Sequence, residues 1–144
     1  MNTIALTISI VLFPIALIHL GWSFGLIWPA KSEQELSNMV VGAKDATKMP
    51  GKLLTRIVAL AIAAAACWPL MWQGLIWYPH AVPQTLVWLG MWILTSVFLL
   101  RGAISYLPNT FAAVQPFYRL NRIIYSPLCL GLGTGFFLLV TNPL

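Results

Sequence analysis

Long uncharged runs of apolar residues dominate this chain, and two shorter segments hold all of its charged side chains. A membrane-spanning helix needs about 20 mostly apolar residues to cross about 30 Å of hydrocarbon. Four runs come close to this length, and they predict spans at about residues 3–28, 57–78, 84–101 and 123–141. We therefore expect an all-α fold, an integral membrane four-helix bundle in which residues 1–144 form a single transmembrane domain.

The charged side chains fall on one side of this predicted bundle. The eight Lys and Arg residues and the three Asp and Glu residues all lie within residues 31–56 and 101–122. These windows cover the connections at 29–56 and 102–122, whereas the remaining connection and both termini have no charged side chain. Because cytoplasmic loops are enriched in Lys and Arg, we predict that both charged loops are cytoplasmic and that both termini lie outside.

The first charged loop has the features of a short helix. Ser32 and Glu35 fit a capping box, whose side chains accept hydrogen bonds from free backbone N–H groups at a helix start. Apolar residues then recur at helical spacing, at Leu36, Met39, Val40 and Ala43. We predict a short amphipathic helix on the cytoplasmic face between spans 1 and 2, ending before Pro50. An ordered cap that packs on the bundle is an equal alternative.

Composition narrows the class of protein further. Hydrophobic residues make up 60% of the chain and charged residues 8%, which leaves too few polar side chains to cover a water-facing surface. The net charge of +5 comes from cations beside apolar runs, without a basic groove or a recognition helix. We therefore expect membrane lipids with anionic headgroups as partners, and no nucleic acid.

The sequence lacks most of the residue sets on which membrane enzymes depend. No Asp or Glu lies in a predicted span, and His19 and His80 are the only histidines. A metal centre would need three or more converging ligands, and no carboxylate pair is present for acid–base catalysis. We therefore predict no metal and no cofactor, and we favour a non-enzymatic protein.

Two groups of polar side chains remain as candidate sites. His19, with Trp22 one turn later, is the intramembrane polar candidate, because ionisable residues within spans are functional candidates by default. A neutral imidazole bonded to a neighbouring helix is the alternative. The second group lies at the cytoplasmic ends of the third and fourth spans and comprises Arg101, Arg119, Arg122, Tyr125 and Ser126. Guanidinium groups match phosphate geometry, so this group is a candidate site for a lipid headgroup, and simple anchoring of the spans is the interpretation that we favour.

Glycines four residues apart occur in two of the spans, at Gly21 and Gly25 and at Gly131 and Gly135. Small residues at this spacing let helices approach closely inside a bilayer. We expect these glycines to serve packing within the bundle, and a homo-oligomer or a membrane protein partner is the alternative.

Three segments of the chain resemble one protein family. They are "IHLGWSFGLIWP" near the start, "VVGAKDATKMP" in the first loop and "RGAISYLPNTFAAVQPFYRLNRIIYSPLCLGLGTGF" near the end. In these segments the chain resembles the DUF3995 family of small bacterial integral membrane proteins of unknown function. The resemblance implies a four-span bundle in the bacterial inner (cytoplasmic) membrane, and it supplies no activity. It singles out the positions His19, Trp22, Arg101, Arg119, Tyr125, Ser126 and Pro127.

This chain departs from the family pattern at two places. A Tyr-Trp pair is expected where the chain has Gly21 and Trp22, and an Asp is frequent where it has Asn121. The second departure weakens the idea of an acidic catalytic group at that position.

We predict from these observations a multi-pass inner-membrane protein that binds a lipid or a partner protein without catalysis. One alternative is a membrane enzyme that acts on a lipid phosphate or a quinone-like substrate through His19 or the arginines. The other is a small carrier or channel subunit that functions as an oligomer.

Overall fold

The computed structural model describes residues 1–42, 48–79, 81–107 and 115–142, and its regular elements there are all helices. Four helical segments are long and apolar enough to cross a membrane. They are α1 (Asn2–Ser23), α3 (Lys52–Trp72), α4 (Gln84–Ile104), and a continuous segment of α5 (Phe117–Leu120), a π-helical turn η1 (Asn121–Tyr125) and α6 (Ser126–Thr141). The short helix α2 (Glu33–Val40) lies between the first two. The predicted all-α fold with four candidate spans and a short helix after the first is confirmed.

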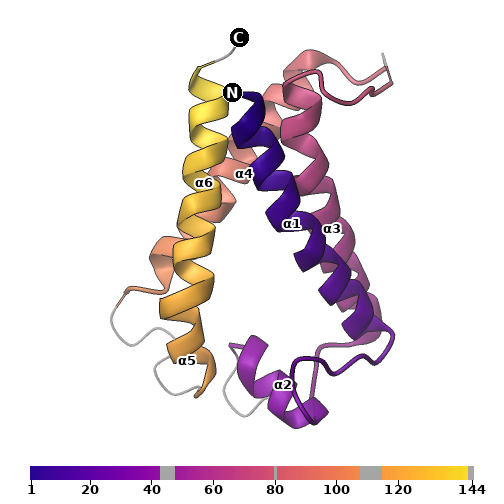
Figure 1. The fold of residues 1–144 in the computed structure, drawn as a ribbon, viewed down its shortest axis with the longest axis vertical. Helices are drawn as coiled ribbons and strands as arrows, with labels where there is room; N and C mark the ends of the chain where they lie inside the picture. Colours follow the sequence, from indigo (N-terminus) through magenta and orange to yellow (C-terminus); the bar gives the residue numbers. More distant parts are fainter. Residues whose placement is uncertain (43–47, 80, 108–114, 143–144) are drawn as a thin grey trace.

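The four long helices form two antiparallel pairs. Helix α1 packs along α3 and α4 packs along α6, whereas contacts between the two pairs are fewer. The pairs converge at the end that holds the N-terminus and separate toward the opposite end, where α2 lies below the gap (Figure 1). This splayed arrangement decides where the bundle is filled and where it is hollow.

Helices α1 and α3 end earlier than the predicted spans, at Ser23 and Trp72 rather than near residues 28 and 78. Each is closed by a glycine with positive φ, Gly25 at +95° and Gly74 at +64°. The next residue donates its N–H to a carbonyl five residues back, from Leu26 to Gly21 and from Leu75 to Leu70. This is a Schellman motif, which stops a helix even where the following residues are apolar.

The second and fourth long segments begin earlier than predicted, at Lys52 and Phe117 rather than near residues 57 and 123. Four cations lie in the first two turns of these segments, and all four are exposed: Lys52, Arg56, Arg119 and Arg122. Long basic side chains can keep the charged group in water while the backbone continues as a helix. A prediction from hydropathy places the start of a span after the nearest charged residue, whereas the helix itself includes that residue.

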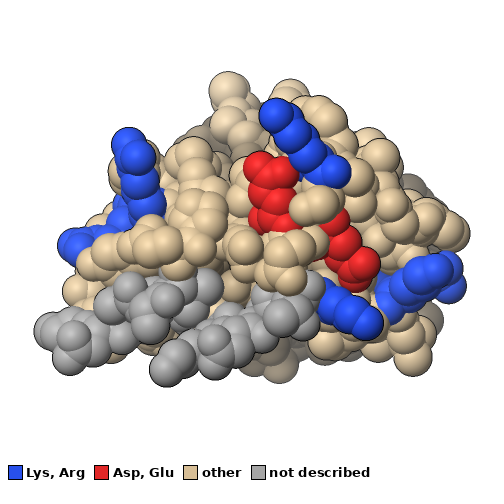
Figure 2. Space-filling model, turned by 90° about the horizontal axis from the view of Figure 1, so that it is seen from below, with Lys and Arg blue, Asp and Glu red and all other residues tan. Residues whose placement is uncertain are grey.

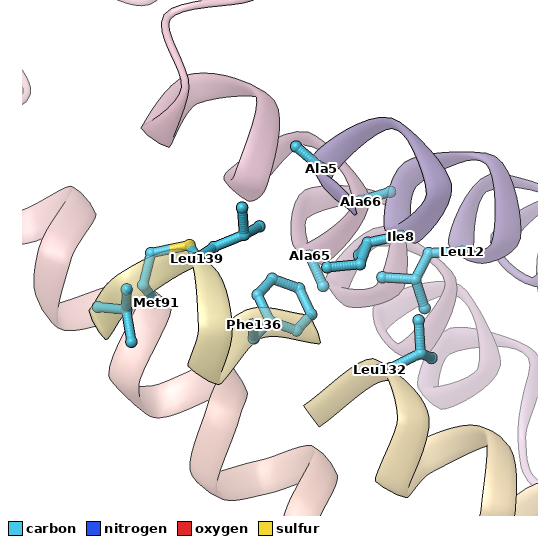
Figure 3. Close-up of a cluster of buried hydrophobic side chains, with 10 residues drawn as sticks. Ala5, Ile8, Leu12, Ala65, Ala66, Met91, Leu132, Phe136 and Leu139 are labelled. Atoms are coloured by element: carbon cyan, nitrogen blue, oxygen red, sulfur yellow. The ribbon is translucent and has the colours of Figure 1, made fainter. Parts of the chain in front are cut away.

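The apolar core occupies the end where the pairs converge. Phe136 of α6 is fully buried, and its ring stacks on Phe98 of α4 with 5.6 Å between the ring centroids. Figure 3 shows side chains from both pairs around it, including Leu12 from α1 and Ala65 from α3. Small side chains in the α1–α3 pair and one large ring between the pairs therefore fill this end of the bundle.

Polar side chains connect the helices through backbone carbonyls. The Ser9 hydroxyl donates to Ala66 O at 2.6 Å, which links α1 to α3. The indole N–H of Trp68 donates to Val87 O at 2.9 Å, and that of Trp72 donates to Leu139 O at 3.0 Å. These bonds tie α3 to α4 and to α6, and they satisfy groups that would be costly to leave unpaired in hydrocarbon.

The glycines that bring α4 and α6 together are Gly102 and Gly133, which the spacing pattern did not single out. A Cβ on Gly133 would lie 2.9 Å from the backbone nitrogen of Leu99, and one on Gly102 would lie 3.0 Å from Ser126 O. The expectation for the first glycine pair is wrong, because Gly25 lies beyond the end of α1. In the second pair, Gly135 packs against Ile8, whereas a Cβ on Gly131 would meet no heavy atom within 4 Å.

We predict that Gly133→Ala destabilises the protein and that Gly131→Ala does not. Both glycines lie in α6, so each substitution gains about 1 kcal/mol in helix propensity. Only at Gly133 must the backbone of α4 move, at a cost of about 1–3 kcal/mol. Thermal unfolding in detergent measures the difference, and equal melting temperatures for the two variants would contradict the close α4–α6 contact.

Candidate functional site

Helix α2 begins at the predicted cap and packs on the bundle. The Ser32 hydroxyl accepts a hydrogen bond from the Glu35 N–H at 3.1 Å, and the Glu35 carboxylate accepts one from the Lys31 N–H at 2.8 Å. Leu36 is 1% exposed and Ser37 is fully buried. The structure thus favours the ordered cap over a helix lying free on a surface. Ala43, the last residue of the predicted apolar stripe, lies outside the described residues.

A cavity of about 460 Å³ lies between α2 and the four long helices, toward the ends where the helix pairs separate. This volume is within the range of small-molecule sites, which is about 300–1,000 Å³. All four long helices contribute to its walls, and Met39 and Val40 of α2 close it at one end. Most of the wall is apolar, from residues that include Leu12, Ile15, Ile62, Phe98, Leu128 and Leu132. The polar residues that also line it are therefore few and can be described one by one.

Arg101 is the charged residue in the cavity wall, and two buried neutral side chains orient it. Its two terminal nitrogens donate to the Ser105 hydroxyl and to the Asn121 side-chain carbonyl, each at 2.9 Å. The Asn121 amide in turn donates to the Ser105 hydroxyl at 2.7 Å. Asn121 is fully buried and Ser105 is 1% exposed, so this cluster joins α4 to the π-helical turn away from solvent. Wide π-helical turns are frequent at functional sites.

His19 and Trp22 line the same cavity from α1. Their rings are in contact, with centroids 4.7 Å apart. The Nδ1 atom of His19 lies 2.8 Å from Ile15 O, and a carbonyl oxygen only accepts, so Nδ1 holds the proton. Among the described residues, no hydrogen bond reaches Nε2 of His19, so that atom is available to a ligand as an acceptor when the ring is neutral. The imidazole thus bonds within its own helix and not to a neighbouring one.

Tyr125 connects the cavity wall to its cap. The side chain is half-buried, and its hydroxyl donates to Met39 O of α2 at 3.3 Å. Its ring lies against Phe117, with centroids 6.1 Å apart. Tyr125 and Met39 both line the cavity, so this contact holds the cap over its polar wall.

The structure does not bring the other predicted site residues into the cavity. Arg119 and Arg122 are exposed, and the Arg122 guanidinium lies over the rings of Tyr106 and Tyr118 at 5.6 and 5.5 Å. Ser126 is fully buried, and its hydroxyl forms no hydrogen bond within the described residues. The sequence-based group therefore divides into Arg101 and Tyr125 inside the cavity and three residues outside it.

Figure 2 looks onto the end of the molecule that holds α2 and shows basic side chains spread around acidic ones. The described acidic side chains, Glu33 and Glu35, belong to α2, and none of the four long helices contains an Asp or Glu. The ends of α1 and α4 and the starts of α3 and α5 lie at this end of the molecule. Basic residues lie in α3, α4, α5 and η1, and the Arg56 guanidinium of α3 lies over the ring of Phe24, which follows α1. The cavity thus lies at the cationic end of the bundle.

The sequence offered signals for some of the residues that complete this site. Met39 and Val40 belong to the apolar stripe of α2, and Asn121 stands within the arginine-bearing segment. Ser105 and Phe98 carry no signal that separates them from other span residues. Their roles depend on which face of α4 meets α6, and that is decided by the glycine contacts.

We predict that Asn121→Leu destabilises the protein by about 1–3 kcal/mol, because Arg101 and Ser105 would each lose a hydrogen-bond partner. Asn121→Asp is the matched control, since a carboxylate accepts from both groups and keeps the cluster bonded. Thermal unfolding in detergent compares the variants. Wild-type stability in Asn121→Leu would show that the cluster does not hold Arg101 in place.

Comparison with known proteins identifies the family and leaves the activity open. A family model described as a protein of unknown function, DUF3995, matches residues 12–136. This match runs from the middle of α1 into α6 and includes every residue of the cavity wall described above. It confirms the resemblance found in the three sequence segments. Searches among curated proteins and among solved structures found no match. Because the family model covers most of the chain, the protein belongs to the DUF3995 family.

Proposed function

We propose that this protein binds an amphiphilic small molecule with an anionic headgroup, without catalysing its conversion. The observation that supports this most directly is the place of Arg101, a cation in the wall of a mostly apolar cavity within candidate membrane spans. An apolar wall suits a hydrocarbon body, and a guanidinium suits a phosphate or carboxylate through paired N–H donors. A ligand that offers both parts matches the cavity better than a wholly polar or wholly apolar one.

The hydrogen bonds around Arg101 support a binding role over simple anchoring. A basic residue that only anchors a span can reach into the headgroup layer with a mobile side chain. Arg101 is instead held by Ser105 and Asn121, both buried, so the orientation of its guanidinium is set before a ligand arrives. Preorganisation of this kind lowers the entropy lost on binding. Arg119 and Arg122, which are exposed, suit the anchoring role.

His19 supports a second candidate, a membrane enzyme that acts on a lipid phosphate or a quinone-like substrate. Its Nε2 atom can accept a proton, and it lines the cavity that also contains Arg101. Among the described residues that line the cavity there is no Asp or Glu to orient this histidine. For this reason we favour binding. Mass analysis of lipids recovered from the protein separates the candidates, because an enzyme would change the ligand on incubation.

We further propose that the cationic end faces the cytoplasm and that both termini are periplasmic, in a bacterial inner membrane. The support is the distribution of basic residues, all of which fall in or next to the two loops at one end of the predicted bundle. The cavity would then lie in the inner leaflet half, within reach of anionic headgroups on the cytoplasmic side.

We predict that Arg101→Gln weakens retention of anionic lipid and that Arg119→Gln combined with Arg122→Gln does not. Loss of charge-assisted hydrogen bonds of about 1.5–3 kcal/mol corresponds to roughly 10- to 100-fold weaker binding. Native mass spectrometry of protein released from nanodiscs measures retention. Arg101→Lys keeps the charge without the fork and should give an intermediate value.

A stability control accompanies this experiment. Thermal unfolding of each variant shows whether the bundle is intact, because Arg101 also bonds to Ser105 and Asn121. If the double variant lost the lipid while Arg101→Gln retained it, the exposed arginines would be the headgroup site and the cavity proposal would fail.

For the orientation, we predict that a periplasm-dependent alkaline phosphatase reporter is active when fused after Leu144 and inactive when fused after Asp45. Fusions to a reporter that works only in the cytoplasm should give the opposite pattern. The reverse result for both reporters would overturn the proposed orientation.

A further inference from the structure

A second hollow lies along the seam between α1 and α6, outside the cavity. It has a volume of about 370 Å³ and is lined by residues that include Ile4, Thr7 and Ile8 of α1 and Gly131 and Gly135 of α6. A Cβ on Gly131 would meet no heavy atom within 4 Å, so the groove is open at this residue. The Thr7 hydroxyl donates to Thr3 O at 2.8 Å within its own helix, which leaves the groove almost without free polar groups.

The groove and the cavity adjoin. Leu128 and Leu132 line both, so the same two side chains form the boundary between them. The groove leads from this boundary toward the end that holds the N-terminus, because α1 and α6 run antiparallel between the two ends. At 1.5 Å per residue, Leu128 and Gly135 are about 11 Å apart along α6. The two hollows therefore lie end to end, with Arg101 in the wall of the cavity and mostly apolar residues around the groove.

We propose that the seam between α1 and α6 is the lateral opening of the cavity and that the ligand is a long-chain amphiphile. Its anionic headgroup rests at Arg101, and its hydrocarbon chain passes Leu128 and Leu132 to lie in the groove beside Gly131. This inference rests on the proposed function and adds the length of the chain and the route by which it reaches the bilayer.

Two observations favour a chain in this groove over a second copy of the protein. The groove lies next to a cavity whose wall contains a cation. An anionic ligand with a hydrocarbon tail would occupy both hollows, whereas a helix packed in the groove would leave the cation without a role. The small residues that line it do not form a flat helix face either, because Gly135 already packs against Ile8 within the bundle. One narrow chain therefore fits the space that remains.

The test uses three probes with the same headgroup chemistry: hexadecyl phosphate, octyl phosphate and inorganic phosphate. The shift in thermal unfolding temperature of the purified full-length protein is measured with each probe in a neutral detergent. Gly131→Leu and Thr7→Phe narrow the groove from opposite sides. Thr134→Leu is the matched control, because Thr134 is exposed on α6 and does not line the groove. Partition of each probe into micelles is the same for every variant, so differences between variants report on the groove.

We expect hexadecyl phosphate to stabilise wild type and Thr134→Leu more than octyl phosphate does, and inorganic phosphate to have the smallest effect. The groove variants should lose the preference for the longer chain and keep the shift from octyl phosphate. If both groove variants keep the preference while Arg101→Gln abolishes binding, the chain route is wrong and the proposed function stands. If no alkyl phosphate gives a shift that depends on Arg101, both fail. A dimer that Gly131→Leu disrupts would assign the groove to a second copy.

Discussion

Arg101 brings a positive charge into a part of the bundle whose walls are otherwise mostly apolar, and its environment is built around that charge. Charged groups inside a bilayer are expensive, and those that occur are paired, hydrogen-bonded or next to a water-filled cavity. Here Ser105 and Asn121 accept from the guanidinium and bond to each other. The position of the cation therefore depends on the contact between α4 and the π-helical turn before α6.

That contact depends in turn on the packing of the helix pairs. Gly102 and Gly133 let α4 and α6 lie against each other, and Ala59, Ala65 and Ala66 are buried in α3, which packs along α1. Between the pairs, large side chains such as Phe136 fill the end that holds the N-terminus. At the other end the pairs separate and α2 covers the space (Figure 1). The cavity is thus a consequence of two tight pairs that meet at one end only.

Much of this architecture follows from the sequence. Apolar runs of about 20 residues are typical of membrane spans, and basic residues confined to alternate connections place the positive charge at one end of the bundle. The cap of α2 was also predictable, since Ser32 and Glu35 act locally. The helix ends at Gly25 and Gly74 were missed because hydropathy does not register a left-handed glycine. The division of the arginines was beyond the sequence, because Arg101 and Arg119 differ in which face of which helix they occupy, and that depends on tertiary packing.

The polar groups of the cavity have complementary roles. Arg101 supplies charge, His19 supplies an acceptor at Nε2, and Tyr125 ties the cap to the wall. None of these residues alone identifies a ligand. Together they line one mostly apolar cavity. A soluble anion would bind the polar groups and leave the apolar wall unfilled, and a plain hydrocarbon would fill the apolar wall without bonding to the polar groups.

The most direct measurement is an experimental structure of the wild-type protein crystallised from a lipidic mesophase made with native membrane lipids. The account predicts continuous density that begins beside Arg101 and His19 and extends past Leu132. A cavity that holds only ordered water, or helix pairs that close together so that Arg101 faces the lipid, would contradict it.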